Sequence, residues 1–260
     1  NISNQEGKIE VYLRGIGSSD SDFGSDPAVA TLYNGIYLPR PRSIGPMFFD
    51  VERVEVAKGP QGTLRGRNAV GGTINIISKR PDFDEYYGQA KVGVGEYSFR
   101  EVEAILNFGV SDDLAFRLAA SWEERDPYME NAAADIIQDT GGLAGQGIRV
   151  QDSLNGNLQA PGAIDDTAVR LSMLWEPGDR FSAFVLADYV EQNGSSIPGA
   201  FSGRSIAAGY DIEDLDNPYR QYFVSQGRMD NEISGIAATL NYDFDTWTLE
   251  YNGSYREYDF

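Results

Sequence analysis

The feature that most constrains the fold is a period-two alternation of side chains that recurs after Pro81. In Leu114–Trp122 every second residue is apolar, and the residues between are small or polar. Such alternation places one set of side chains on each face of a β-strand. The pattern returns in residues 102–108, 169–175, 181–189, 236–242 and 247–251, and a weaker version covers 86–97. We therefore predict seven strands between residues 86 and 260.

The connectors between these strands distinguish two kinds of β protein. Short connectors fall at 96–98, 111–113, 176–179 and 243–246, and long ones at about 124–166 and 191–230. A soluble sandwich also alternates apolar and polar positions, but it has no reason to alternate short turns with long loops. Outer-membrane barrels do both. Aromatic residues also gather at strand ends, where an interfacial girdle would lie: Trp122, Trp175, Tyr189, Tyr242 and Trp247.

The number of strands says how much of a barrel to expect. Bacterial barrels close on even numbers of strands from 8 upward. Seven is odd, so we expect the chain to hold an incomplete barrel. The predicted fold class is mainly β: a small α+β or mostly β unit, then the first antiparallel strands of a transmembrane β-barrel.

Composition excludes several classes of function. Charged residues make up 23% of the chain, and no apolar run reaches the 18 or so residues that a membrane helix needs. The chain has no Cys and no His, which removes thiolate and imidazole metal sites, disulfides and His-activated nucleophiles. Residues 1–81 hold 10 Lys and Arg against 8 Asp and Glu, whereas residues 82–260 hold 11 against 32. The strongly acidic larger part disfavours nucleic-acid binding.

Residues 1–81 follow a different pattern, with short β-branched runs separated by glycine-rich loops. We predict strands at Lys8–Arg14, Ala28–Leu38, Val51–Lys58 and Gly72–Lys79. Gly71 and Gly72 allow the backbone to fold where a side chain would collide. The change of period places a domain boundary at Pro81, which gives domains 1–81 and 82–260.

One segment carries a family resemblance. Residues 51–79 read VERVEVAKGPQGTLRGRNAVGGTINIISK, preceded by LRGIG at 13–17 and LYNGIY at 32–37. In order and spacing these motifs resemble the plug domain of TonB-dependent outer-membrane receptors. The spacing of Gly66 and Gly71 also occurs in phosphate-binding loops, but Gly72-Thr73 stands where Lys-Ser/Thr is required, so a nucleotide site is rejected.

The resemblance implies a location and a function. Residues 1–81 would be the C-terminal part of the plug, and residues 82–260 the N-terminal part of a multi-pass barrel in the Gram-negative outer membrane. The protein would not be an enzyme and would need no cofactor. It would import a scarce nutrient, with a ferric siderophore as the first expectation. Its partners would be outer-membrane lipid, a small-molecule iron chelate and TonB, which binds an N-terminal segment not seen in this sequence.

The resemblance also implies site residues. The ligand would bind the plug apex, where this chain offers Tyr37, Arg40, Arg42, Arg65 and Arg67. Guanidinium groups favour an anionic ligand. Contacts between plug and barrel are expected from Arg14, Arg53 and Glu55, with the arginines pairing with barrel carboxylates. No metal site is predicted, because the acidic run Asp211–Asp216 lacks the glycine and the ligand spacing of a calcium loop.

Several alternatives stay open. A receptor of the same architecture could carry cobalamin, haem or a saccharide. A passive porin or an adhesion barrel is the other alternative, although an open pore has no use for 81 globular residues before its first strand. An outer-membrane protease or lipase is disfavoured by the lack of His, and a signalling receptor would need an upstream extension.

Overall fold

The computed structural model describes residues 2–5, 8–17, 27–39, 47–62, 68–128, 130–131, 162–195, 220–221 and 230–259. Almost all regular structure in these ranges is β-strand. Within the described residues, no helix is long and apolar enough to cross a membrane. The strands form one seven-stranded sheet, one four-stranded sheet and two small pairs.

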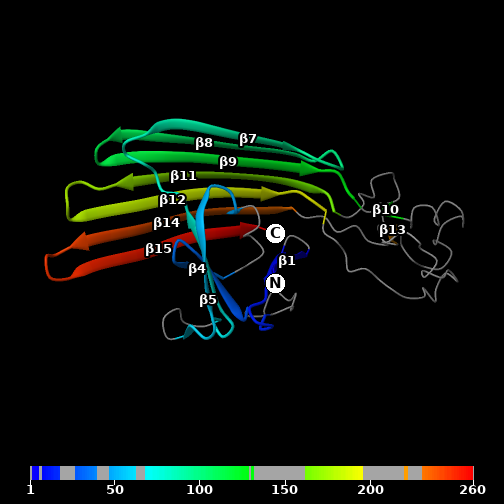
Figure 1. Ribbon diagram of the computed structural model, residues 1–260, viewed down its shortest axis with the longest axis horizontal. Helices are drawn as coiled ribbons and strands as arrows, with labels where there is room; N and C mark the ends of the chain where they lie inside the picture. Colours follow the sequence, from blue (N-terminus) through cyan, green and yellow to red (C-terminus); the bar gives the residue numbers. More distant parts are fainter. Residues whose placement is uncertain are drawn as a thin grey trace, which may run out of the picture.

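The seven-stranded sheet, called the wall below, is an antiparallel meander. Its order is β15-β14-β12-β11-β9-β8-β7, and Figure 1 shows these strands side by side. Their bounds are β7 Tyr86–Val94, β8 Arg100–Ser111, β9 Leu114–Arg125, β11 Ile164–Trp175, β12 Phe181–Gln192, β14 Asn231–Asp243 and β15 Thr248–Asp259. The seven predicted strands are therefore all present, and the short connectors lie where the sequence placed them.

The two long predicted connectors fall largely outside the described residues. What is described of them includes β10 Glu130–Asn131 and β13 Arg220–Gln221, which pair in parallel. That pairing links the connector after β9 to the connector after β12, and the sequence gave no sign of it. Both connectors leave the same end of the wall as the turn between β7 and β8.

The four-stranded sheet, called the small sheet below, has the order β4-β3-β6-β5. Its strands are β3 Val29–Tyr33, β4 Ile36–Leu38, β5 Val51–Lys58 and β6 Gly72–Ser78. A separate hairpin joins β1 Ile2–Gln5 to β2 Lys8–Val11. The strand predicted over Ala28–Leu38 is wrong as a single element, because Asn34 and Gly35 both adopt positive φ and make a two-residue hairpin turn there.

Glycine is required at the start of β6. Gly72 has a φ of +139°, and a side chain there would collide with the carbonyl group of Ala57 on the neighbouring strand. A Cβ at Gly71 would lie 3.0 Å from Cγ2 of Ile16. The sequence-based expectation that backbone approaches closely at these two glycines is confirmed.

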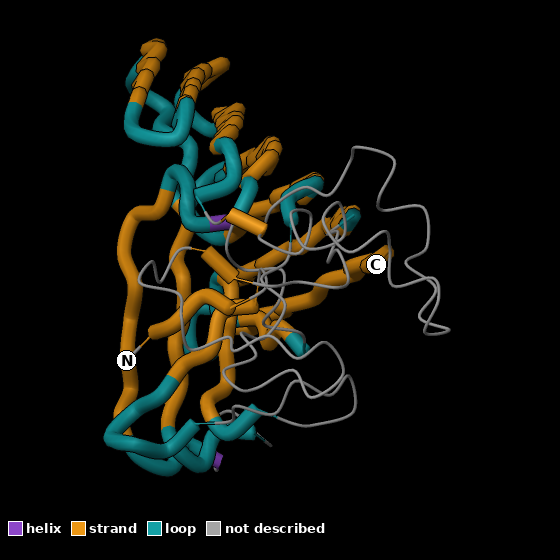
Figure 2. Tube along the Cα trace, turned by 90° about the vertical axis from the view of Figure 1, so that its right-hand side faces the viewer, coloured by secondary structure: helices purple, strands orange, loops and turns teal. Residues whose placement is uncertain are grey.

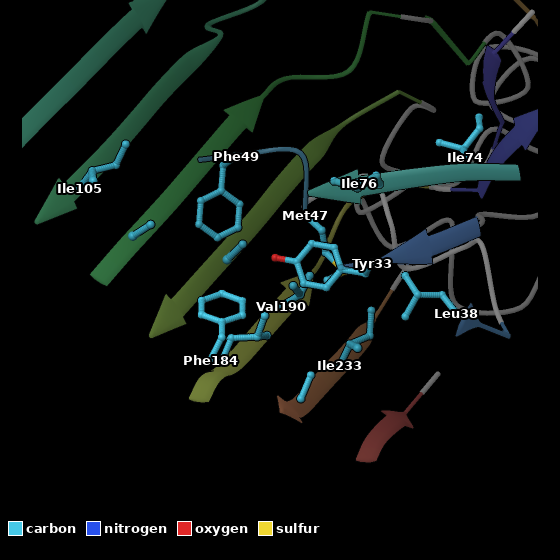
Figure 3. Packing of buried hydrophobic residues seen from close by; sticks show 14 of the residues in the cluster. Tyr33, Leu38, Met47, Phe49, Ile74, Ile76, Ile105, Phe184, Val190 and Ile233 are labelled. Carbon is cyan, nitrogen blue, oxygen red and sulfur yellow. The ribbon is translucent and has the colours of Figure 1, made fainter. Parts of the chain in front are cut away.

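The small sheet lies on the concave face of the wall. Figure 2, which looks along the wall from the end with the long connectors, shows the seven strands as an arc with the small sheet inside it. An apolar cluster joins the two, with Tyr33, Met47, Phe49 and Ile76 from the small sheet and its loops, and Ile105, Phe184, Val190 and Ile233 from the wall (Figure 3). We call this concave surface of the wall its inner face.

The outer face of the wall is apolar and exposed. Among its side chains, Leu118, Leu171, Ile236 and Leu249 are each at least 36% exposed. Aromatic pairs cluster near the end with the short turns, including Trp175 with Phe181, and Phe244 stacked on Trp247. The period-two pattern thus sorted the residues of each strand onto the correct faces.

Candidate functional site: the interface between the small sheet and the wall

The best-defined functional geometry is a cluster of charged side chains buried between the two sheets. Arg117, Arg170 and Asp188 project from the inner face of the wall and are almost fully buried. They face the segment Met47–Asp50, which connects β4 to β5 and is called the docking loop below. Burying charges is costly unless each finds a partner, so the partners define what this surface does.

Arg117, on β9, grips the carboxylate of Asp50 with both arms. Its Nε lies 2.8 Å from Oδ2 and its Nη2 lies 2.6 Å from Oδ1. The remaining nitrogen donates to the hydroxyl of Tyr87 at 2.7 Å. Both side chains of the pair are only 4% exposed. The backbone N–H of Asp50 donates to Glu103 at 3.2 Å, so three wall strands hold one docking-loop residue.

Arg170, on β11, binds the backbone of the docking loop. It is 1% exposed and donates to the carbonyl oxygens of Phe49 at 3.0 Å and Met47 at 3.1 Å. Its guanidinium plane lies 4.4 Å from the ring centroid of Phe49 and 5.1 Å from that of Tyr33. Cation–π contacts strengthen when desolvated. Arg170 therefore recognises the shape of the loop as well as its acceptors.

A second ion pair supports this arrangement from the side. Arg256, on β15, donates to Asp188 on β12 at 2.7 Å, and its Nη1 lies 3.9 Å from the sulfur of Met47. Gly235 on β14 stands between these two strands, and a Cβ there would lie 2.8 Å from the Arg256 guanidinium. The absence of a side chain at Gly235 lets Arg256 reach across one strand to its carboxylate.

The segment that leads from the small sheet into the wall is also anchored. Asn107 on β8 is fully buried. It accepts from the N–H of Asp82 at 3.0 Å and donates to the carbonyl oxygens of Asp82 at 2.9 Å and Glu85 at 2.6 Å. The N–H of Gly109 donates to Glu85 as well. One side chain thus fixes both ends of the turn at 82–85.

Tyr33 shows how dry the interface is. Burial raises the pKa of Tyr33 to about 12, although the positive charge of Arg170 opposes the shift. The phenol therefore stays neutral in the interface, where a phenolate would have no water to stabilise it.

The predicted contacts between plug and barrel are not formed within the described residues. Arg14 is exposed and makes no ion pair there. Arg53 pairs with Glu52 at 2.6 Å and with Glu55 at 2.9 Å, all on β5, and the hydrogen bond to Glu55 raises the pKa of Arg53. Glu55 also accepts from Asn75 on β6. The polarity is the reverse of the expectation, because the wall supplies the guanidinium groups and the docking loop the acceptors.

The predicted ligand residues are only partly visible. Arg40, Arg42, Arg65 and Arg67 lie outside the described residues. Tyr37 is described, and its hydroxyl accepts from the side-chain amide of Asn68 at 2.8 Å. The contact brings together β4 and the glycine-rich segment before β6, the two regions that the resemblance assigns to the apex.

Sequence reasoning missed the residues that make the interface, although the pattern held a signal for two of them. Arg117 and Arg170 each occupy an inner-face position in an otherwise small and apolar strand, beside Ala115 and Ala119 or Ala168 and Ser172. A long cation among small neighbours indicates that something fills the space above it. The partner, Asp50, carries no comparable signal.

Comparison with known proteins decides what this arrangement is. Residues 1–73 match the family model described as TonB-dependent Receptor Plug Domain. The chain belongs to the TonB-dependent receptor family. The small sheet is the plug sheet, and the wall is part of the barrel that surrounds it.

Individual relatives agree with this assignment. The catecholate siderophore receptor Fiu of Escherichia coli strain K12 is 35% identical over 117 residues, which cover 44% of this chain and 13% of Fiu. The pesticin receptor of Yersinia pestis is 43% identical over 72 residues, or 28% of this chain and 10% of that receptor. The chain therefore aligns with only a small part of these curated relatives.

A solved structure shows the same fold over nearly the whole chain. The ferric yersiniabactin uptake receptor FyuA from Yersinia pestis superposes with a TM-score of 0.72 and 20% identity, covering 98% of this chain and 36% of FyuA. At that identity the likeness concerns the fold. It extends the correspondence beyond the plug to the seven wall strands.

Proposed function

We propose that the chain is part of an outer-membrane receptor that imports a ferric siderophore with energy delivered through TonB. The observation that carries the proposal is the docked plug. A sheet held by Arg117 and Arg170 against the inner face of the wall occupies the space that a passive pore would leave open. A porin or adhesion barrel has no need for such a closure.

The rest of the assignment follows from the family. The family consists of transport receptors rather than enzymes, and homologous receptors are outer-membrane β-barrels. We assign residues 1–81 to the plug and residues 82–260 to the barrel. TonB would engage a segment N-terminal to the plug. The printed names of the relatives favour siderophores, since Fiu is a catecholate siderophore receptor and FyuA takes up ferric yersiniabactin.

We assign the ligand surface to the plug apex, with Tyr37, Arg40, Arg42, Arg65 and Arg67 as its candidate residues. The hydrogen bond between Tyr37 and Asn68 supports the assignment, because it joins the two segments that carry these residues. Guanidinium forks bind carboxylate and catecholate oxygens in a fixed geometry. An anionic iron chelate fits such a surface.

Uptake by a deletion strain tests the proposal. The full-length receptor is restored on a plasmid, and transport of radioactive iron is measured for catecholate, hydroxamate and carboxylate siderophores, with haem and cobalamin in parallel. We expect receptor-dependent uptake of at least one ferric siderophore that disappears in a strain lacking TonB. Uptake of only haem or cobalamin would move the substrate to another class, and uptake that persists without TonB would contradict active import.

A further inference from the structure

A row of acidic side chains crosses the inner face of the wall near the long connectors. Glu101 on β8, Glu123 on β9 and Asp166 on β11 are direct cross-strand partners, and Gln192 on β12 comes next in the same row. We call these four residues the acidic row. Like charges directly opposite each other destabilise a sheet, so this row needs a positive charge.

The neighbouring basic side chains neutralise only one side of the row. Lys91 lies 2.8 Å from Glu101, and Arg125 attracts Glu123. No basic side chain pairs with Asp166 in the part of the chain that the structure describes. Its charged neighbours are Glu123 and Asp165, which both repel it.

Two buried oxygen atoms beside this carboxylate have no hydrogen-bond partner. They are Oδ1 of Asp166 and Oε1 of Gln192. Gln192 is only 2% exposed, and its amide nitrogen lies 3.4 Å from Oδ2 of Asp166. Leaving buried acceptors unsatisfied is costly. A half-turn of the Gln192 amide would direct its oxygen toward Asp166, which would place carboxylate and amide oxygens around one point.

We propose that the acidic row binds a divalent cation of the calcium class, held by Asp166, Gln192 and Glu123. Calcium takes six to eight oxygen ligands from carboxylates, amide carbonyls and water, in flexible geometry. In the described residues no three acidic side chains are grouped closely enough to hold a metal by themselves. The amide oxygen and water therefore complete the ligand set.

The position gives the cation a structural role. Glu123 lies near the end of β9, Asp166 near the start of β11 and Gln192 at the end of β12, so the site joins the roots of both long connectors. A cation there would fix where these connectors leave the wall. The inference does not depend on which nutrient the receptor carries.

Calcium titration of the full-length receptor tests the site. The protein is purified in detergent, freed of lipopolysaccharide and treated with chelator, and binding is followed by calorimetry with Ca²⁺ and by terbium luminescence. We expect one saturable site whose affinity falls at least about tenfold in Asp166→Asn and in Gln192→Leu, since loss of even an outer partner of a metal costs that much. Glu250→Gln, which removes an exposed inner-face carboxylate on β15, is the matched control and should bind as the wild type does.

Thermal unfolding separates loss of the site from loss of the fold. Asp166→Asn is nearly isosteric and removes a repelled charge, so without metal it should unfold at the wild-type temperature or above. Ca²⁺ should raise the unfolding temperature of the wild type and of Glu250→Gln but not of Asp166→Asn. No saturable binding by the wild type, or equal binding by Asp166→Asn, would overturn the proposal and leave a shared proton as the occupant of the row. Either result leaves the uptake experiment unaffected.

Discussion

The arginines of the interface are each used for a different property of the guanidinium group. Arg117 uses its planar fork to bind a carboxylate with two parallel hydrogen bonds. Arg170 uses its weak hydration to stack on two rings while donating to two carbonyl groups. A lysine has one point charge and no plane, so it could reproduce neither contact.

Breaking the Arg117–Asp50 pair should loosen the docking loop. Arg117→Met leaves the Asp50 carboxylate buried without a counter-charge, and removing one partner of a buried pair costs roughly 3–5 kcal/mol. We expect peptides that cover residues 47–58 to exchange hydrogen for deuterium much faster in the full-length variant. Hydrogen exchange measured by mass spectrometry reports this local opening directly.

A double variant and an exposed pair serve as controls for this prediction. Asp50→Asn removes the charge and still tolerates the positive φ at this position, so Arg117→Met with Asp50→Asn should recover part of the protection. Arg180→Ala breaks the exposed ion pair with Asp245 and should have little or no effect. If the double variant exchanges as fast as Arg117→Met, an uncompensated Asp50 charge is not the cause.

The wrong expectation for Arg53 has a simple physical reason. Residues two apart on a strand project from the same face, so Arg53 and Glu55 are natural partners on β5. That local pairing costs less chain ordering than reaching the wall. Sequence patterns show which face a charge occupies, but a partner distant in the sequence, such as Asp50 for Arg117, depends on how the two sheets dock.

At the scale of elements, the linker between plug and wall is the segment whose position rests on one side chain. Asn107→Leu keeps the volume but leaves two carbonyl groups and one N–H of residues 82–85 without their partner, at roughly 1–3 kcal/mol. We expect faster deuterium uptake in peptides that cover 79–86. Asn252→Leu removes an exposed inner-face amide from β15 and should leave this linker unchanged. Equal protection in Asn107→Leu would show that Gly109 and the chain itself hold the turn.

Strands were predictable from the sequence to different degrees. The wall strands were found because a strand with one apolar face must alternate, and such strands pair with their neighbours in the chain. The plug is harder, since β3 pairs in parallel with β6, which lies more than forty residues away. The β3–β4 turn was missed although Asn34-Gly35 is a strong hairpin signal, because apolar residues continue on both sides of it.

For the whole molecule, the arc of the wall and the plug inside it were predictable from the family resemblance and the change of period at Pro81. The geometry of the ligand surface was not. Its candidate arginines lie in glycine-rich and proline-rich loops, where no repeating pattern fixes the direction of a side chain.

The orientation of the molecule in the membrane follows from the connectors and can be tested at described turns. Outer-membrane barrels keep short turns on the periplasmic side and long loops outside, which places the β7–β8 turn at Glu96 outside and the turns at Asp179 and Asp245 inside. The chain has no cysteine, so single cysteines at these positions in the full-length receptor have no background from residues 1–260. Asn155 and Ser202, in the long connectors, lie outside the described residues.

We expect a membrane-impermeant maleimide to label Glu96→Cys on intact cells, because that turn shares the end of the wall from which both long connectors leave. Asp179→Cys and Asp245→Cys should react only after the outer membrane is permeabilised. All three residues are on exposed turns, so differences in labelling report the side of the membrane rather than burial, and labelling in detergent confirms that each thiol is reactive. Labelling of Asp179→Cys but not Glu96→Cys on intact cells would invert the topology and would place the acidic row near the periplasm.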